Sequence, residues 1–187
     1  MDFSWIRPRG SIIKGVGIRH PGVVKYLEIW DKVAEVIVMG DNDGYKDSLK
    51  DYLNDDQLDQ AITVIKAMAR KGAQMGTLRI DHPDIEEFIK AKQVSGRLTK
   101  FNFSVVVTDE FMNAVKNNEM FELKFNGKVY KKIKATELYD LIMQSTFNRA
   151  EPGILFYDNM QKNNPLSYLG PVSTTNPCGS QQLAASL

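Results

Sequence analysis

The order of helical and extended segments along the chain predicts an α/β protein. Three short runs, at 75–80, 101–107 and 154–157, are typical of strands, and they alternate with segments whose apolar residues recur every three or four positions. Strands separated by helices pair in parallel through right-handed crossovers. With 43% hydrophobic and 25% charged residues among 187, the chain can bury a core. Its strands are too few to close a usual barrel.

The N-terminal part of the chain is expected to be mostly helical. Helices are predicted over 22–38, over 45–53 and over 55–69, the last capped by Asp55 or Asp56. The apolar stripe of the first helix is Val23, Leu27, Trp30, Ala34 and Ile37, and that of the last is Leu58, Ile62, Ile65 and Met68.

The middle of the chain continues the alternation. Residues 81–84 open a helix after the strand at 75–80, since acids and a proline favour a first turn. His82 is expected to serve this turn rather than to act as a ligand or base, because no second histidine or cysteine stands near it. Thr108 caps the helix that follows the strand at 101–107. The inward face of the earlier helix is Ile85, Phe88 and Ile89.

A β-hairpin is expected next, over 120–133, because Asn126-Gly127 is the strongest short hairpin signal. A further helix starts at Thr136. The strand at 154–157 is followed by Asp158-Asn159, at the C-terminal strand edge where ligands bind in α/β sheets.

Composition narrows the partners and the compartment. A net charge of +1 gives no electrostatic reason to expect nucleic acid or a membrane surface as a partner. No apolar run reaches the ~18 residues of a membrane span, and the start of the chain lacks the features of a signal peptide. A single cysteine cannot form an internal disulfide, so we expect the cytoplasm. Neither end looks like a solvated tail, so residues 1–187 are interpreted as one segment of a longer polypeptide.

Several motifs fail on inspection. Residues 6–21 are expected to form a loop, and Gly15-Val16-Gly17 within it lacks the third glycine and the preceding strand of a dinucleotide fingerprint. The acidic run from Asp41 has Tyr52 where a calcium loop needs its twelfth-position glutamate. Two distant histidines and one cysteine argue against a Ser-His-Asp hydrolase and a structural zinc, so no metal site is expected.

Cys178 remains the candidate reactive group. Pro177 fixes its own φ and pushes Asn176 toward an extended conformation, while Gly179 lets the backbone bend. This pattern predicts a thiol presented on a tight loop. The alternative is a buried cysteine that acts as a small hydrophobe, its commonest role. The residues alone leave both interpretations open.

Several segments, in order, resemble ribonucleotide reductases. Asn176-Pro177-Cys178-Gly179 resembles their active-site finger loop, usually Asn-Pro-Cys-Gly-Glu and most common in the adenosylcobalamin-dependent class II enzymes. Residues 6–11 and 70–76 resemble their two effector-specificity loops. Residues 41–67 match least and are interpreted as a subgroup insertion. Further similar segments are 82–89, 100–105 and 151–156.

The resemblance implies part of the ten-stranded α/β barrel of these reductases, with Cys178 at the tip of a loop through its centre. It implies adenosylcobalamin as cofactor and a thiyl radical at Cys178, which takes a hydrogen atom from the ribose 3′ carbon of a ribonucleotide. The 2′ hydroxyl then leaves, and a cysteine pair supplies the electrons. The partners it implies are the ribonucleotide substrate, a deoxynucleoside triphosphate effector, the remaining segments of the reductase and a second copy in a homodimer.

The resemblance also assigns roles to residues. Asn176 matches the asparagine that hydrogen-bonds the substrate, and Thr174, Thr175 and Gly179 would line the ribose pocket. Cations in the specificity loops suit a triphosphate effector. The matching loop residues are Arg7, Arg9 and Ser11 in the first loop, and Arg70, Lys71, Gly72, Ala73 and Gln74 in the second.

Two departures from the family pattern leave alternatives open. The glutamate that takes the 3′-hydroxyl proton falls at Ser180, whose hydroxyl cannot hold that proton near neutral pH. The reducing cysteine pair is also missing from these residues. The main interpretation is a reductase fragment, and the alternative, which Ser180 favours, is a non-catalytic remnant that binds nucleotides or partners. A glycyl-radical enzyme of related design is weaker, because no glycyl loop is visible.

The chain on its own is expected not to reduce nucleotides, because one thiol cannot deliver two electrons as a disulfide. The measurement is deoxynucleotide formation from ribonucleoside di- and triphosphates with adenosylcobalamin and a dithiol. Product above a no-protein control would contradict this prediction.

Overall fold

A three-stranded parallel sheet forms the centre of the molecule. The computed structural model describes residues 1–39, 50, 52–68 and 73–184. The strands lie in the order β1 (Gln74–Arg79), β2 (Phe101–Val107) and β5 (Gly153–Phe156). The expected parallel pairing is confirmed, with Gln74 opposite Phe101 and Ser104 opposite Gly153. The N-terminal residues continue the sheet beyond β1 through a parallel bridge between Asp2 and Thr77.

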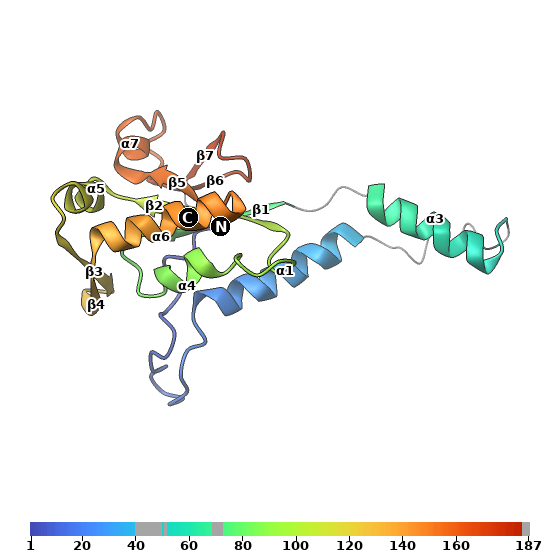
Figure 1. Cartoon of the computed structure of the whole chain (residues 1–187), viewed down its shortest axis with the longest axis horizontal. Helices are drawn as coiled ribbons and strands as arrows, with labels where there is room; N and C mark the ends of the chain where they lie inside the picture. The colour runs from blue at the N-terminus through green and yellow to red at the C-terminus, as the bar shows by residue number, and fades with distance from the viewer. Residues whose placement is uncertain (40–49, 51, 69–72, 185–187) are drawn as a thin grey trace.

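Three helices cover one face of this sheet: α1 (Val23–Met39), α4 (Ile85–Lys90) and α6 (Ala135–Arg149) (Figure 1). Phe88 of α4 stacks on Phe103 of β2 with ring centroids 4.6 Å apart. The predicted inward residues of α4 are fully buried, as are Val23 and Leu27 of α1. Trp30 differs from its prediction, since it is 40% exposed on the outer side of α1. Within the described residues, no helix is long and apolar enough to cross a membrane.

The elements after β2 follow the prediction closely. Thr108 caps α5 (Asp109–Lys116) by accepting a hydrogen bond from the Phe111 backbone N–H at 3.2 Å. The hairpin consists of β3 (Met120–Phe125) and β4 (Lys128–Lys134), which pair antiparallel. Asn126 and Gly127 have φ of +48° and +76°, as a two-residue hairpin turn of type I′ requires.

The helix α3 (Asp55–Met68) begins at the predicted residue, and the last predicted residue, 69, lies outside the described residues. Asn54 is the cap: its Oδ1 accepts from the Gln57 N–H at 2.9 Å, and Gln57 Oε1 accepts from the Asn54 N–H at 3.2 Å. This reciprocal pair is a capping box, so the expectation of an aspartate cap was wrong. Most of the short helix expected over 45–53 lies outside the described residues, and the subgroup insertion over 41–67 stays a prediction.

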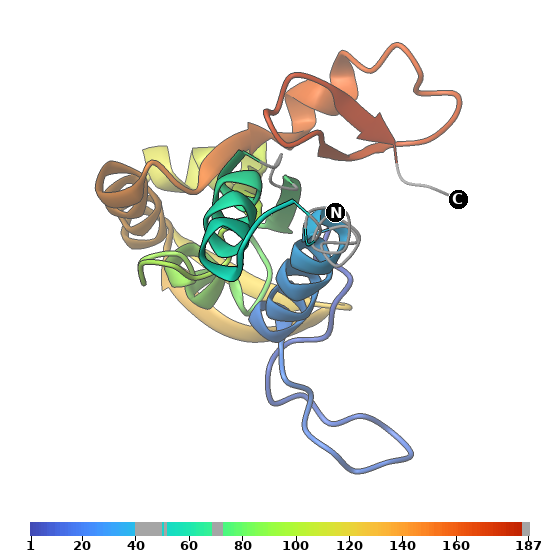
Figure 2. The ribbon, with the colours of Figure 1, turned by 90° about the vertical axis from the view of Figure 1, so that its right-hand side faces the viewer.

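Three elements near the C-terminus were not predicted: α7 (Tyr157–Lys162), β6 (Val172–Thr175) and β7 (Gln182–Ala184). They lie together as one lobe against the sheet face that the helices leave free (Figures 1 and 2). Asp158, which was expected at a ligand-binding edge, accepts a hydrogen bond from the Asp109 N–H at 2.7 Å and so supports the first turn of α5.

A buried carboxylate ties the first loop to the helical layer. Asp84, just before α4, accepts hydrogen bonds from the Arg9 N–H at 3.0 and 3.1 Å and from the Val23 N–H at 3.0 Å. Its own N–H donates to His82 Nδ1 at 3.0 Å, and His82 Nε2 lies 2.9 Å from the Ile6 carbonyl oxygen. The loop at residues 6–11, the start of α1 and the start of α4 therefore share one polar anchor.

Replacing Asp84 by asparagine is expected to lower the free energy of unfolding by about 1–3 kcal/mol, because an amide NH₂ would face one of the buried N–H donors. Urea unfolding monitored by circular dichroism measures the loss. The matched control is Asp140→Asn on the exposed side of α6, where a change within about 0.5 kcal/mol is expected. Equal effects of the two substitutions would contradict the anchoring role.

Candidate active site

Residues 172–181, which we call the finger, run across the sheet face that the helices leave free. The finger starts beside the C-terminal strand ends, passes Thr77 in the middle of β1, where Thr174 Oγ1 lies 3.4 Å from Thr77 Oγ1, and reaches the N-terminal end of β2. There the Pro177 carbonyl accepts a hydrogen bond from Asn102 Nδ2 at 2.7 Å. The finger root is held by Gln161 of α7, whose amide pairs with both backbone groups of Val172, at 2.6 and 3.1 Å.

The finger tip brings three predicted site residues together. Asn176 Nδ2 lies 3.0 Å from Cys178 Sγ and 3.1 Å from Ser180 Oγ. Ser180 Oγ also lies 3.0 Å from Cys178 Sγ. The thiol is exposed, so the alternative of a buried cysteine is wrong. The prediction of a thiol presented on a tight loop is therefore confirmed.

The backbone closes the tip around these side chains. Gly179 has a φ of +75°, a conformation that side chains rarely adopt, and its N–H donates to the Asn176 carbonyl at 2.9 Å. The Gln181 N–H donates to Asn176 Oδ1 at 2.9 Å, and the Asn176 N–H donates to the Gln181 carbonyl at 3.1 Å. Asn176 therefore organises the turn through its side chain and its backbone.

Hydrogen bonds make the thiol more acidic than usual. They lower the pKa of Cys178, first through the Ser180 hydroxyl, then through the Ser180 backbone and the Asn176 amide. Donors that favour the charged form shift a pKa in this direction. In this chain Ser180 contacts the sulfur itself, a role that the sequence did not suggest.

The two threonines expected to line a ribose pocket lie in β6 below the tip. Thr174 is buried against Thr77, and Thr175 is 2% exposed, with its hydroxyl donating to the Asn176 carbonyl at 3.1 Å. Both threonines support the finger from within. Their contact with a substrate stays a prediction.

The loop at residues 6–11, predicted to be the first specificity loop, lies beyond the C-terminal end of β1. Arg9 Nη1 forms an ion pair with Glu87 Oε1 at 3.0 Å, and the Ser11 hydroxyl donates to the Pro8 carbonyl at 2.7 Å. Arg7 is exposed. Arg9 therefore ties this loop to α4 through its side chain and, at Asp84, through its backbone N–H.

The described part of the segment predicted to be the second specificity loop, residues 73–76, lies at the opposite, N-terminal end of β1. Arg70, Lys71 and Gly72 lie outside the described residues, while Ala73 and Gln74 stand where β1 begins. Gln74 Oε1 is buried and accepts no hydrogen bond within the described part of the chain. A buried acceptor without a donor costs free energy, which suits a residue that completes its bonding with a ligand or a partner. One chain does not bring the described parts of the two loops together.

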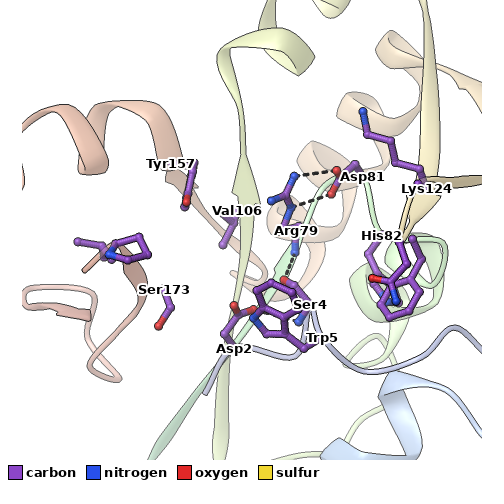
Figure 3. A pocket seen from close by; sticks show the side chains of 15 residues that line it. Asp2, Ser4, Trp5, Arg79, Asp81, His82, Val106, Lys124, Tyr157 and Ser173 are labelled. Atoms are coloured by element: carbon purple, nitrogen blue, oxygen red, sulfur yellow. Dashed lines mark hydrogen bonds and ion pairs between the residues drawn. The ribbon is translucent and has the colours of Figure 1, made fainter. Parts of the chain in front are cut away.

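A cavity of about 490 Å³ opens at the C-terminal strand ends (Figure 3). Arg79, Val106 and Tyr157 line it, and Trp5 stands at its wall. Arg79 forms a two-pronged pair with Asp81, with Nε–Oδ1 and Nη2–Oδ2 distances of 3.0 and 2.8 Å, and this pairing raises the pKa of Arg79. Val106 is four residues beyond Asn102, or ~13 Å along the strand, so the cavity and the finger tip lie at opposite ends of the sheet.

Sequence reasoning missed the residues that position the tip, Asn102 and Gln161. One signal was present: Asn102 and Ser104 alternate with Phe101 and Phe103, so the N-terminal half of β2 has one apolar and one polar face. Gln161 gave no signal, because a glutamine on a short polar helix is typical of a solvated surface.

Comparison with known proteins identifies the family of this chain. A family model described as the barrel domain of ribonucleotide reductase matches residues 56–185. The chain belongs to the ribonucleotide reductase family. Its open α/β sheet is part of the reductase barrel, so the fold class expected from the resemblance is confirmed.

The relatives agree with this assignment. A vitamin B12-dependent ribonucleoside-diphosphate reductase of Thermoplasma acidophilum is 34% identical over 185 residues, which cover 97% of this chain and 21% of the relative. A reductase of the same name from Mycobacterium tuberculosis (strain H37Rv) is 33% identical over 180 residues, or 95% of this chain and 22% of the relative. A putative ribonucleoside-diphosphate reductase large subunit of Frog virus 3 is 30% identical over 99 residues, or 50% and 18%. The chain spans about a fifth of the length of these relatives.

His82 is expected to make folding sensitive to mild acid. Burial lowers the pKa of its ring, and the ring must be neutral at Nδ1 to accept the Asp84 N–H. In the unfolded chain His82 binds a proton near pH ~6.5, whereas in the folded chain its ring is still neutral at that pH. Its contribution to stability is therefore complete above that pH and is lost as the pH falls through the lower folded pKa.

Urea unfolding between pH 7.5 and 5.5 measures this effect. The free energy of unfolding of the wild type should fall with pH more steeply than that of His82→Gln, which cannot titrate. Identical slopes in the two proteins would show that His82 does not titrate as its burial demands.

Proposed function

We propose that this chain supplies the finger loop of a ribonucleotide reductase, with Cys178 as the group that exchanges a hydrogen atom with the substrate ribose. The observation that carries the proposal is the exposed Cys178 sulfur, which lies 3.0 Å from the Asn176 amide at the tip of a loop anchored over the sheet. The whole enzyme reduces ribonucleotides to deoxyribonucleotides and requires segments that this chain does not contain.

In this mechanism the Cys178 sulfur acts after its own hydrogen atom has been removed. The sulfur radical takes the hydrogen from the ribose 3′ carbon, which is reversible because the S–H bond is close in strength to the activated C–H bond. The 2′ hydroxyl leaves as water, and a dithiol elsewhere in the enzyme supplies two electrons and becomes a disulfide. Cys178 then returns its hydrogen atom to the 3′ carbon. Asn176 turns its amide from the sulfur to a substrate hydroxyl.

Ser180 stands where the reductase motif has its glutamate base. Its hydroxyl lies 3.0 Å from the sulfur but cannot accept and keep the 3′-hydroxyl proton near neutral pH. General-base catalysis is worth ~10²–10⁴ in rate, so the proposal implies a slow enzyme unless another base serves.

The relatives' names indicate vitamin B12, and we propose that the complete protein uses adenosylcobalamin. The cavity at the C-terminal strand ends does not fit that cofactor. Cavities of about 490 Å³ suit ligands of drug size, which a cobalamin exceeds, and this cavity lies at the sheet end away from Cys178. The corrin must therefore be held by other segments, and its chemistry when bound would be to generate the radical that reaches Cys178.

We propose a homodimer and a deoxynucleotide effector as further partners. The two specificity loops lie at opposite ends of β1, so a second copy could bring the first loop of one chain to the second loop of the other. Ile29 and Trp30, 59% and 40% exposed on α1, offer an apolar surface for that contact. A cytoplasmic location is proposed on the single reduced thiol.

The second candidate function is a remnant that binds nucleotides or partners without catalysis. Ser180 favours it, because the position that carries the base in the family motif holds a weaker group. The two candidates differ in whether a completed protein turns over.

A chimera separates them. Residues 1–180 replace the matching segment of the Mycobacterium tuberculosis relative, in versions with Ser180 and with Ser180→Glu. The glutamate version is expected to form deoxynucleotides ~10²–10⁴ times faster than the serine version, because it restores a base. Deoxynucleotide formation with adenosylcobalamin and a dithiol is the measurement.

Cys178→Ser in the same chimera is the control and should abolish turnover. Equal rates with serine and glutamate would contradict the role given to position 180. A folded glutamate chimera without activity, beside an active parent enzyme, would contradict the reductase role and favour the remnant.

A further inference from the structure

Asn102 occupies an unusual place in the sheet. Its neighbours Phe101 and Phe103 are buried in the helical layer, at 1% and 2% exposure, while Asn102 points to the opposite face. Asparagine is depleted in strands, because its side chain competes for backbone hydrogen bonds and packs poorly. We therefore expect the Asn102 amide to make a specific hydrogen bond with the finger.

That contact is the Pro177 carbonyl, 2.7 Å from Asn102 Nδ2. Within the described part of the chain, this is the hydrogen bond that joins the tip, residues 176–181, to the sheet. The other hydrogen bonds of the tip run among its own residues or to Thr175. Asn102 therefore sets where the closed tip stands relative to the strands.

The bond acts on the peptide group that leads directly into Cys178. A peptide is planar, so fixing the Pro177 oxygen also fixes the nitrogen and the Cα of Cys178 within one rigid unit. The pyrrolidine ring already restricts φ of Pro177. Little freedom is left on the N-terminal side of the sulfur.

The strand end that carries Asn102 is itself rigid. Lys92 forms an ion pair with Glu151 and donates to the Phe101 carbonyl, on one side of Asn102. Glu151 Oε1 accepts from the Phe103 N–H at 3.4 Å, on the other side. A functional group is placed accurately when the residue that holds it is held in turn by a second set of contacts.

We propose that Asn102 is a positioning residue of the reductase: its amide, through the Pro177 carbonyl, holds Cys178 in the orientation in which Asn176 and Ser180 contact the sulfur. The catalytic meaning of this inference rests on the proposed function. The positioning itself does not, since it concerns the sulfur in the free chain.

The test uses the fact that Cys178 is the only cysteine in the sequence. Alkylation by iodoacetamide between pH 6 and 10 gives the pH midpoint of this one thiol. In Asn102→Ala and in Asn102→Asp, which keeps the size but loses the donor at neutral pH, the midpoint should move upward by ~0.5 unit. That shift is about threefold in thiolate fraction near neutral pH. The control is Asn113→Ala on the exposed side of α5, which should keep the wild-type midpoint.

A wild-type midpoint in folded Asn102→Ala would overturn the proposal, and so would a midpoint that moves in Asn102→Ala but stays in Asn102→Asp. Because a variant can fail to fold, a second measurement uses the wild type. A scalar coupling through the hydrogen bond, between Asn102 Nδ2 and the Pro177 carbonyl carbon, should be seen by NMR, and its absence in a folded sample would also overturn the proposal.

Neither readout needs turnover. An inactive chimera together with a shifted midpoint would therefore reject only the reductase role and leave the positioning role of Asn102 standing.

Discussion

The site depends on one constraint, the alternation of side chains along β1 and β2. Phe101, Phe103 and Leu78 point into the helical layer, whereas Thr77, Asn102 and Ser104 make the middle of the other face polar. A polar face cannot be sealed by an apolar helix without leaving hydrogen-bonding groups unpaired. A finger with its own polar groups can cover it, and the contacts from Thr77 and Asn102 are the result.

The helical layer and the first loop follow a second rule, which is that buried polar groups find partners. Asp84 satisfies two backbone N–H groups that belong to different segments, and His82 adds a link to Ile6. These hydrogen bonds to Asp84 fix the loop at residues 6–11 although the loop buries no large apolar surface. The loop at residues 6–11, predicted to be a specificity loop, can therefore stay exposed and still be placed accurately, as a recognition loop needs.

Local chemistry was sufficient to predict most of the fold. The apolar stripes predicted α1 and α4, Asn126-Gly127 predicted the hairpin, and Thr108 predicted the start of α5. The cap at Asn54 was missed because three cap-forming residues stand in a row and only the reciprocal bond to Gln57 decides among them. The elements α7, β6 and β7 are short and polar, and they are defined by contacts with distant residues rather than by their own pattern. The presentation of Cys178 on a tight loop was predictable from Pro177 and Gly179, but the anchor at Asn102 was not, because it joins residues 75 positions apart.

That separation also orders the events of folding. Contacts between distant residues require the closure of long loops, and their entropy cost makes them form slowly. The Thr77–Thr174 contact spans 97 residues, whereas neighbouring strands of the sheet are much nearer in sequence. We therefore expect the finger to dock late, onto the paired strands β1 and β2. During synthesis, Cys178 leaves the ribosome after all three strands of the sheet have been made, so we expect its thiol to reach its place after the sheet has formed.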